Sequence, residues 1–290
     1  MIWLRARAFP VLAVLLALLV VWYAAAVWMN SQWTLDQAAR AGTTPDLATI
    51  IADTWAQDRP KLPAPHQVAV EFYDLVFGKP VTSKRSLVYH AWITLSATVM
   101  GFAIGTGLGI ALALGIVHNR AMDMSVMPWA IASQTIPILA IAPMVIVVLN
   151  SIGISGLLPK AVISAYLSFF PVVVGMVSGL RSPDVMQMDL LKTYNASRIQ
   201  ALFKLRLPAS LPFLFASLKV GIAAALVGAV VGELPVQQGG LGARLLGGSY
   251  YGQTVQMWAA LFMAALLAAL LVLIVARVEA GVLRRMGMVQ

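Results

Sequence analysis

Between two strongly apolar blocks, residues 181–208 read RSPDVMQMDLLKTYNASRIQALFKLRLP. The start of this segment carries the signals of a helix N-terminus. Ser182 suits the cap, Pro183 suits the first helical position, and Asp184 is favoured at the positive end of a helix. The helix is expected to end just before Asn195, because asparagine enters the left-handed conformation more easily than other non-glycine residues.

A second helix is expected directly afterwards. Ser197 and Gln200 have the spacing of a capping box, and Leu207-Pro208 is expected to end this helix. The apolar positions of the pair are too numerous for a solvated loop, so one face is expected to pack on membrane helices or on another protein. These positions are Met188, Leu191, Tyr194, Leu202, Phe203 and Leu205.

Outside this helix-turn-helix the chain is too apolar for a water-soluble fold. Hydrophobic residues make up 60% of the 290 positions and charged residues 11%, whereas soluble chains are roughly 25% charged. The apolar residues form blocks of the roughly 20 residues that a helix needs to cross a bilayer. We therefore predict an all-α integral membrane protein with six transmembrane helices, at about residues 9–29, 90–117, 125–149, 156–180, 211–232 and 255–276.

The first apolar block has an alternative interpretation. Arg5 and Arg7 precede it and Ala24-Ala25-Ala26 supplies small residues, as in a cleaved signal peptide. Its apolar run exceeds the ~7–15 residues of a signal core, which favours an uncleaved helix.

The basic residues flank the apolar blocks and form no stripe, so the net charge of +9 indicates membrane topology rather than a nucleic-acid surface. Six helices place both termini on one side, and the two short outer loops hold only Lys160 and Arg244. This asymmetry predicts a cytoplasmic N-terminus and C-terminus. The basic residues on that side are Arg5, Arg7, Arg120, Arg181, Lys192, Arg198, Lys204, Arg206, Arg277, Arg284 and Arg285.

This topology divides the chain into four parts. Residues 1–29 form the cytoplasmic start and first membrane helix, and residues 30–86 an external polar segment with prolines at 60, 63 and 65 and short surface helices near 46–55 and 67–77. Residues 87–280 form a core of five membrane helices that includes 181–208, and residues 281–290 a cytoplasmic tail. The sequence offers no function for the stretch 30–60.

The sequence lacks the residues needed for disulfide bonds, for a metal cluster and for a P-loop nucleotide site. The chain has no cysteine, its histidines at 66, 90 and 118 are too scattered to suggest a metal cluster, and no GxxxxGK segment occurs. Any ATP chemistry is therefore expected from a partner. Gly101, Gly105, Gly107 and Gly109 fit close helix packing better than a phosphate loop.

The segment 181–208 resembles the "EAA" coupling loop of ATP-binding-cassette importer permeases. Asp189 stands at the acidic position of that motif, and Asn195 at the position of its glycine. Leu190 and Leu191 replace two alanines, which puts in doubt how closely the helix seats or which ATPase it accepts. The remaining matches are Tyr194, Ala196, Ser197, Phe203, Leu207 and Pro208. We refer to residues 181–208 as the coupling segment.

Other stretches over about residues 60–280 are similar to the nitrate, sulfonate and taurine branch of these permeases. They lie at 62–65, 90–95, 134–143 (QTIPILAIAP), 169–171, Glu233 and 240–242. The resemblance implies the type I importer permease fold in a bacterial inner membrane.

The resemblance also implies partners and a mechanism. A second permease subunit, identical or related, would complete the pathway, a cytosolic ATPase dimer would bind ATP and Mg²⁺, and an external binding protein would deliver a small anionic, aromatic or vitamin-like solute. The chain itself would change no covalent bond, so it would not be an enzyme.

Three groups of residues are candidates for the solute pathway or the outer loop. Ser133, Gln134 and Thr135 form a polar step near Pro137 and Pro143, which would line a pathway or else satisfy carbonyls freed at a bend. A second group, Tyr166, Phe169 and Phe170, would form a gate or else simply pack. The third group is Glu233 with Gly240 and Gly242, where the carboxylate is a functional acid or, as we favour, an acceptor for the backbone amides of 239–242. His90 and Trp92 are expected to be interfacial anchors.

Two rival functions lack their expected residues. A secondary transporter or channel would be expected to carry ionisable residues at membrane depth, and the blocks hold only Glu233 and Lys219, both near block ends. An intramembrane enzyme would need an acid and base pair, a nucleophile with its base, or metal ligands, and none appears.

Overall fold

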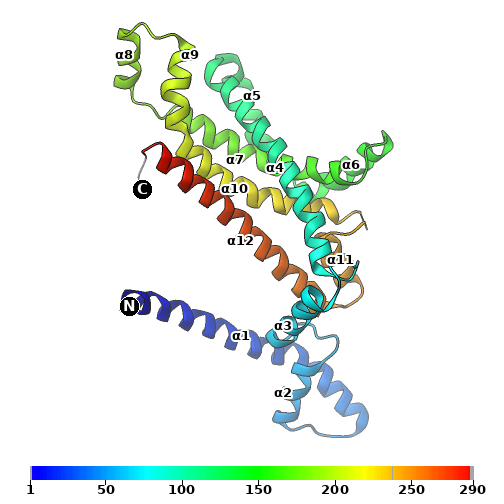
Figure 1. The fold of residues 1–290 in the computed structure, drawn as a ribbon. Helices are drawn as coiled ribbons and strands as arrows, with labels where there is room; N and C mark the ends of the chain where they lie inside the picture. The colour runs from blue at the N-terminus through cyan, green and yellow to red at the C-terminus, as the bar shows by residue number, and fades with distance from the viewer. Residues whose placement is uncertain (1, 237, 288–290) are drawn as a thin grey trace. The chain divides into compact units, whose positions relative to one another are not determined.

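A computed structural model describes residues 2–236 and 238–287 of the 290-residue chain. The described residues form helices and no strand (Figure 1). The helices are α1 (Ile2–Ala41), α2 (Leu47–Ala56), α3 (Pro65–Tyr73), η1 (Asp74–Gly78), α4 (Leu87–His118), α5 (Arg120–Ser133), α6 (Ile138–Ser151), α7 (Leu157–Leu180), α8 (Val185–Thr193), α9 (Arg198–Ala201), η2 (Leu202–Arg206), α10 (Leu207–Glu233), α11 (Leu241–Tyr250) and α12 (Thr254–Arg285).

Within the described residues, five helical spans are long and apolar enough to cross a membrane, and a sixth is reached if the bent pair α5–α6 counts as one. This agrees with the predicted all-α membrane fold. The chain divides into two compact units, Met1–Tyr89 with Arg244–Met263, and His90–Ala243 with Ala264–Gln290.

In the first unit, α1 is longer than the sequence predicted. It continues without a break to Ala41, so the helix does not end near residue 29, where the first membrane helix was expected to end. The polar residues that suggested a boundary have partners in the rest of the unit. The buried Asn30 side chain accepts hydrogen bonds from the backbone N–H of Lys61 at 2.8 Å and of Leu62 at 3.2 Å. The Thr34 hydroxyl donates to the Asp53 carboxylate at 2.5 Å.

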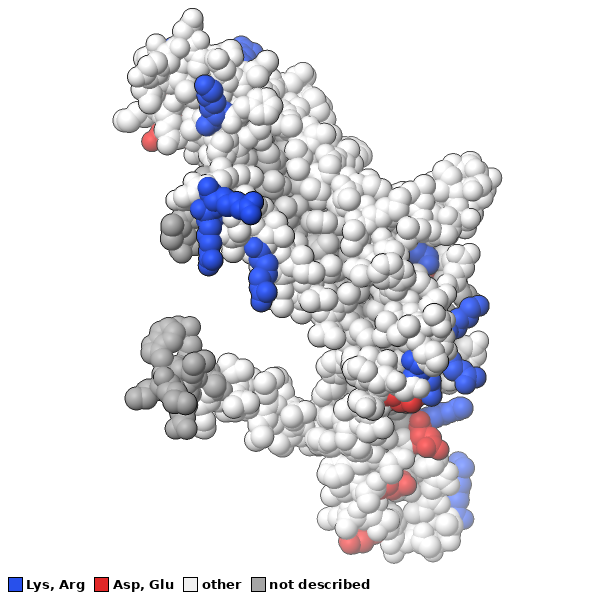
Figure 2. All heavy atoms as spheres, in the orientation of Figure 1, with Lys and Arg blue, Asp and Glu red and all other residues white. Residues whose placement is uncertain are grey.

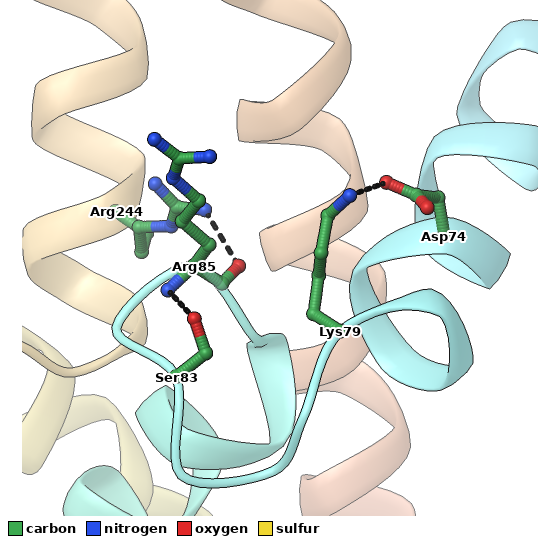
Figure 3. Close-up of polar contacts among 5 residues, drawn as sticks. All are labelled: Asp74, Lys79, Ser83, Arg85 and Arg244. Atoms are coloured by element: carbon green, nitrogen blue, oxygen red, sulfur yellow. Dashed lines mark hydrogen bonds and ion pairs between the residues drawn. The ribbon is translucent and has the colours of Figure 1, made fainter.

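The segment after α1 forms the predicted short helices α2 and α3, and η1 extends α3 by a π-helical turn. The loop from η1 to α4 is held by polar contacts (Figure 3). Lys79 pairs with Asp74 at 3.0 Å, the backbone N–H of Arg85 donates to the Ser83 hydroxyl at 3.2 Å, and Arg244 donates to the Arg85 carbonyl at 3.1 Å.

In the second unit, α7 packs along α10 and against α4, and small residues permit this close approach (Figure 1). A side chain at Gly228 of α10 would meet the Cα of Ser164 on α7 at 2.7 Å. Gly101, Gly105 and Gly109 lie against α7 in the same way, as predicted, but Gly107 has no neighbour within 4 Å.

The predicted third membrane helix is broken. α5 and α6 meet at a bend of 100° across residues 134–137. Pro137 lacks an N–H and restricts the residue before it, which explains why the first helix ends here. The bend predicted from the prolines in the block 125–149 is therefore confirmed.

Candidate functional site

α8 forms the first half of the coupling segment, and its N-terminus lies two residues later than predicted. Asp184 is the cap residue, and its backbone N–H donates to the Gln187 side chain at 3.2 Å. The predicted cap, Ser182, instead donates its hydroxyl to the Gly179 carbonyl at 2.8 Å and so closes the end of α7. The serine is used by the preceding helix because it lies within reach of a carbonyl left free there.

The end of α8 forms a Schellman motif around Asn195. Asn195 has φ 50° and is the only non-glycine among the described residues with positive φ. The backbone N–H of Ala196 donates to the Leu191 carbonyl at 3.0 Å, and that of Asn195 donates to the Lys192 carbonyl at 2.9 Å. Both bonds satisfy carbonyls at the helix end, which fixes the direction of the chain leaving α8. The predicted turn is confirmed.

The second helix begins as predicted but does not end at Pro208. Ser197 and Gln200 form the capping box, with bonds of 2.8 and 3.2 Å. The helix then passes through the π-helical turn η2 directly into α10. The backbone N–H of Leu207 donates to the Leu202 carbonyl, five residues back, so the wider turn gives room for a proline that a regular α-helix would not accommodate. The second half of the coupling segment is thus continuous with the long apolar helix α10.

The coupling segment exposes a largely apolar surface. No residue of α8 is buried. Leu190, Tyr194 and Phe203 are more than half exposed, whereas Leu191, Ala196 and Pro208 are half-buried. Asp189 is exposed and pairs with Lys192 at 2.8 Å. Large exposed apolar side chains on a rigid element are typical of a surface that another protein covers.

Backbone carbonyls at the α5–α6 break accept hydrogen bonds from nearby side chains. The hydroxyls of Ser133 and Thr135 donate to the carbonyls of Ala130 and Ala132 at 2.7 and 2.8 Å, and the Tyr166 hydroxyl donates to the Ser133 carbonyl. These contacts favour the interpretation that polar groups compensate the bend. Thr135 is exposed and Gln134 is half-buried, so their role in a solute path stays a prediction.

The three aromatic candidates differ in burial. Phe169 is 3% exposed and belongs to a core cluster with Val173, Met176 and Leu180, and Tyr166 and Phe170 pack against that cluster. This burial favours packing for Phe169.

Glu233 lies in a buried polar cluster at the end of α10. Its carboxylate accepts bonds from the Thr94 hydroxyl at 2.8 Å and from the backbone N–H of Gly242 at 2.9 Å. These contacts agree with the favoured interpretation, in which Glu233 accepts hydrogen bonds from the backbone amides of 239–242. A side chain at Gly240 would collide with the carboxylate. His90 is 6% exposed and accepts from the Gly240 N–H at 2.9 Å, so the prediction that it anchors the interface is wrong. Trp92 is exposed, as an anchor would be.

One charged pair was missed by the sequence interpretation. Lys219 lies in the middle of α10 and not near its end, and it pairs with Glu279 of α12 at 2.8 Å. The Glu279 side chain is only 12% exposed. The sequence signal was an isolated lysine in one apolar helix and an isolated acid in another, with nothing to indicate that the two meet.

Multiple apolar spans, a bend with satisfied polar groups and a two-helix segment continuous with a long apolar helix define an all-helical membrane protein. This class is supported by comparison with known proteins. The family described as binding-protein-dependent transport system inner membrane component matches residues 105–288, and the chain belongs to it. The chain is accordingly an ATP-binding-cassette transporter permease of the importer type, located in the inner membrane.

Three relatives illustrate the similarity. A protein named probable ABC transporter permease protein from Haemophilus influenzae is 32% identical over 66% of this chain and 79% of its own length. The formylaminopyrimidine transport permease ThiX of Halalkalibacterium halodurans is 31% identical over 62% of this chain and 68% of its own. SsuC of Bacillus subtilis, whose name assigns it to aliphatic sulfonate transport, is 25% identical over 68% of each chain.

Proposed function

We propose that this permease forms half of a solute pathway and converts ATP-driven movement of a cytosolic ATPase into opening of that pathway. Permeases of this family work in importers with an ATPase and a binding protein. The finer proposal is that the coupling segment docks on the ATPase through Asp189, Leu190, Tyr194 and Phe203.

One observation carries this proposal. α8 is capped at its start, closed by the Schellman motif at its end, and exposes an apolar surface. A free surface helix would be polar, and a flexible loop would transmit no movement. The continuous helix from Arg198 to Glu233 supplies the lever that joins this surface to the membrane.

The partners and orientation follow from the same proposal. The coupling segment and both termini lie in the cytoplasm, ATP and Mg²⁺ bind to the ATPase, and the stretch 30–60 lies outside, where the binding protein delivers solute. A second permease subunit, identical or related, completes the pathway.

For the solute we propose a small heteroaromatic or sulfonate-type compound. This rests on the names of two relatives, which refer to transport of a formylaminopyrimidine and of aliphatic sulfonates. Both classes are small and carry polar or anionic groups.

The test is uptake into proteoliposomes that contain the full-length permease and its ATPase, with binding protein added outside. We expect uptake of a labelled pyrimidine or sulfonate only with hydrolysable ATP on the ATPase side and only with binding protein present. A non-hydrolysable ATP analogue is the control. Uptake driven by an ion gradient without ATP would contradict the proposal.

A further inference from the structure

A basic cavity lies behind the coupling segment, on the side of α8 that faces the end of α4. Its volume is about 320 Å³. Val117 and His118 of α4, Leu191 and Lys192 of α8, and Arg206 of η2 contribute to its walls. The cavity is separate from the exposed apolar surface that we propose for docking of the ATPase.

The polar side chains that line this cavity are all basic. They are His118, Lys192, Arg198 and Arg206, and no acidic residue is among the described lining residues. Lys192 pairs with Asp189, but among the described contacts Arg198 and Arg206 have no side-chain hydrogen bond or ion pair. Arg206 is half-buried and has no anionic partner among the described ion pairs. Such a site favours a bound anion.

The position of the cavity in the fold indicates which class of anion it binds. His118 is the last residue of the apolar span Leu87–His118, and Arg198 is the first residue of the span Arg198–Glu233. The cavity therefore lies beside the ends of two long apolar helices, and its wall residue Arg206 is only five residues before the apolar block predicted at 211–232, where lipid headgroups are expected. Figure 2 shows Lys and Arg side chains over α9 and over the end of α12, one acidic side chain beside α8, and a broad uncharged stretch beyond them.

The lining also suits a lipid better than a free ion. Val117, Met188, Leu191 and Ala201 supply apolar wall next to the basic groups. The volume is at the lower end of the range for ligand pockets, about 300–1,000 Å³, which fits a headgroup but not acyl chains. Basic pockets at the ends of membrane helices are a common form of anionic lipid recognition.

We propose that this cavity binds the phosphate-bearing headgroup of an anionic phospholipid, with Arg198 and Arg206 donating to phosphate oxygens. Arginine is suited to this because its planar guanidinium donates two parallel bonds to a phosphate. The bound lipid would join the end of α4 to the coupling segment. This binding site does not depend on the proposed solute or on the docking surface.

The test is native mass spectrometry of the full-length chain released from nanodiscs of phosphatidylglycerol and phosphatidylcholine. We expect retained phosphatidylglycerol on the unaltered chain and about a tenfold or greater loss of affinity in the double variant Arg198→Gln/Arg206→Gln. The matched control is Arg284→Gln/Arg285→Gln, which removes two exposed arginines from the end of α12 outside the cavity. Equal retention in both double variants would overturn the proposal.

Two further measurements make the result decisive. Thermal unfolding of each variant shows whether the chain is folded, and if the double variant unfolds, the single variant Arg198→Gln, at an exposed position, replaces it. Separately, inorganic phosphate and short-chain phosphatidylglycerol are each added in detergent. Stabilisation by the lipid at concentrations where phosphate has no effect supports a lipid site, whereas equal stabilisation by phosphate would show a soluble-anion site and overturn the lipid proposal.

Discussion

The carboxylate of Glu233 accepts a hydrogen bond from the hydroxyl of Thr94 at 2.8 Å, which joins the end of α10 to the first part of α4. The Thr94 oxygen in turn accepts from the backbone N–H of Leu241 at 2.9 Å. Both side chains are fully buried. Glu233 and Thr94 thus accept the backbone N–H groups of Gly242 and Leu241, and together with His90, which accepts from Gly240, they hold the turn that leads into α11.

Replacing Glu233 with alanine is expected to destabilise the chain. The change leaves the Gly242 N–H without its acceptor, and an unsatisfied buried group costs about 1–3 kcal/mol. Unfolding in mixed detergent micelles measures the loss. The matched control is Asp58→Ala, at an exposed acid, where the change is expected to stay within about 0.5 kcal/mol. Equal stability of both variants would show that the cluster is held by other contacts.

The Lys219–Glu279 ion pair predicts that the stability losses of single and double variants are not additive. Lys219→Met leaves Glu279 almost buried and uncompensated, so the single change is expected to reduce stability by about 1–3 kcal/mol. The double variant Lys219→Met/Glu279→Met removes both charges and is expected to recover much of that loss. The same unfolding measurement applies to all three proteins. If the single losses simply add in the double variant, the two residues do not act as a pair.

The left-handed conformation of Asn195 predicts how substitutions at this position change the stability of the chain. Asn195→Gly is expected to preserve stability within about 0.5 kcal/mol, since glycine adopts the positive φ at no steric cost. Asn195→Val is expected to cost about 1–2 kcal/mol or to distort the turn, because left-handed geometry brings Cβ close to the following carbonyl oxygen. Thermal unfolding and co-purification of the ATPase report on the two effects. Equal behaviour of the valine and glycine variants would contradict the role of the turn.

The features of the coupling segment that could be predicted are those that depend on neighbouring residues. The capping box at Ser197 and the left-handed Asn195 are encoded within a few positions of the chain, so the sequence was sufficient to predict them. Ser182 was assigned to the start of α8, but its hydroxyl donates to a carbonyl at the end of α7. A serine between two adjacent helix ends can hydrogen-bond to either of them. The continuity through Pro208 required a π-helical turn that has no clear sequence signature.

The features that could not be predicted depend on distant partners. Asn30 resembles a loop residue until the backbone at 61–62 is placed beside it, and His90 resembles an interfacial anchor until the turn at Gly240 covers it. Lys219 and Glu279 are separated by 60 positions and meet only when α10 packs with α12. Periodicity and composition carry no information about such pairings.

The orientation of the chain depends on whether the bent α5–α6 pair crosses the membrane. If it does, Ser151 lies outside and Met186 inside, and the absence of native cysteine makes both positions easy to label. We expect Ser151→Cys to react with an impermeant maleimide in intact cells and Met186→Cys to react only after permeabilisation. Gln37→Cys, in the stretch proposed to be external, is the positive control. Labelling of Met186→Cys in intact cells would show that the pair returns to the side on which it began.

Asp189 allows the sharpest test of coupling to the ATPase. Its only described ion pair, with Lys192, is exposed, and such pairs contribute little to stability, so Asp189→Lys is expected to change folding by less than about 0.5 kcal/mol. If Asp189 meets a basic group in a desolvated groove of the ATPase, the reversed charge weakens docking by about 2 kcal/mol or more, roughly 30-fold. Affinity of the ATPase for the reconstituted permease and ATP-dependent uptake are the two measurements. Lys192→Ala is the matched control, because it breaks the same ion pair and leaves the acid in place. Weak docking in Asp189→Lys with normal docking in Lys192→Ala assigns the contact to Asp189, whereas normal docking and uptake in Asp189→Lys would leave it a solvated surface acid.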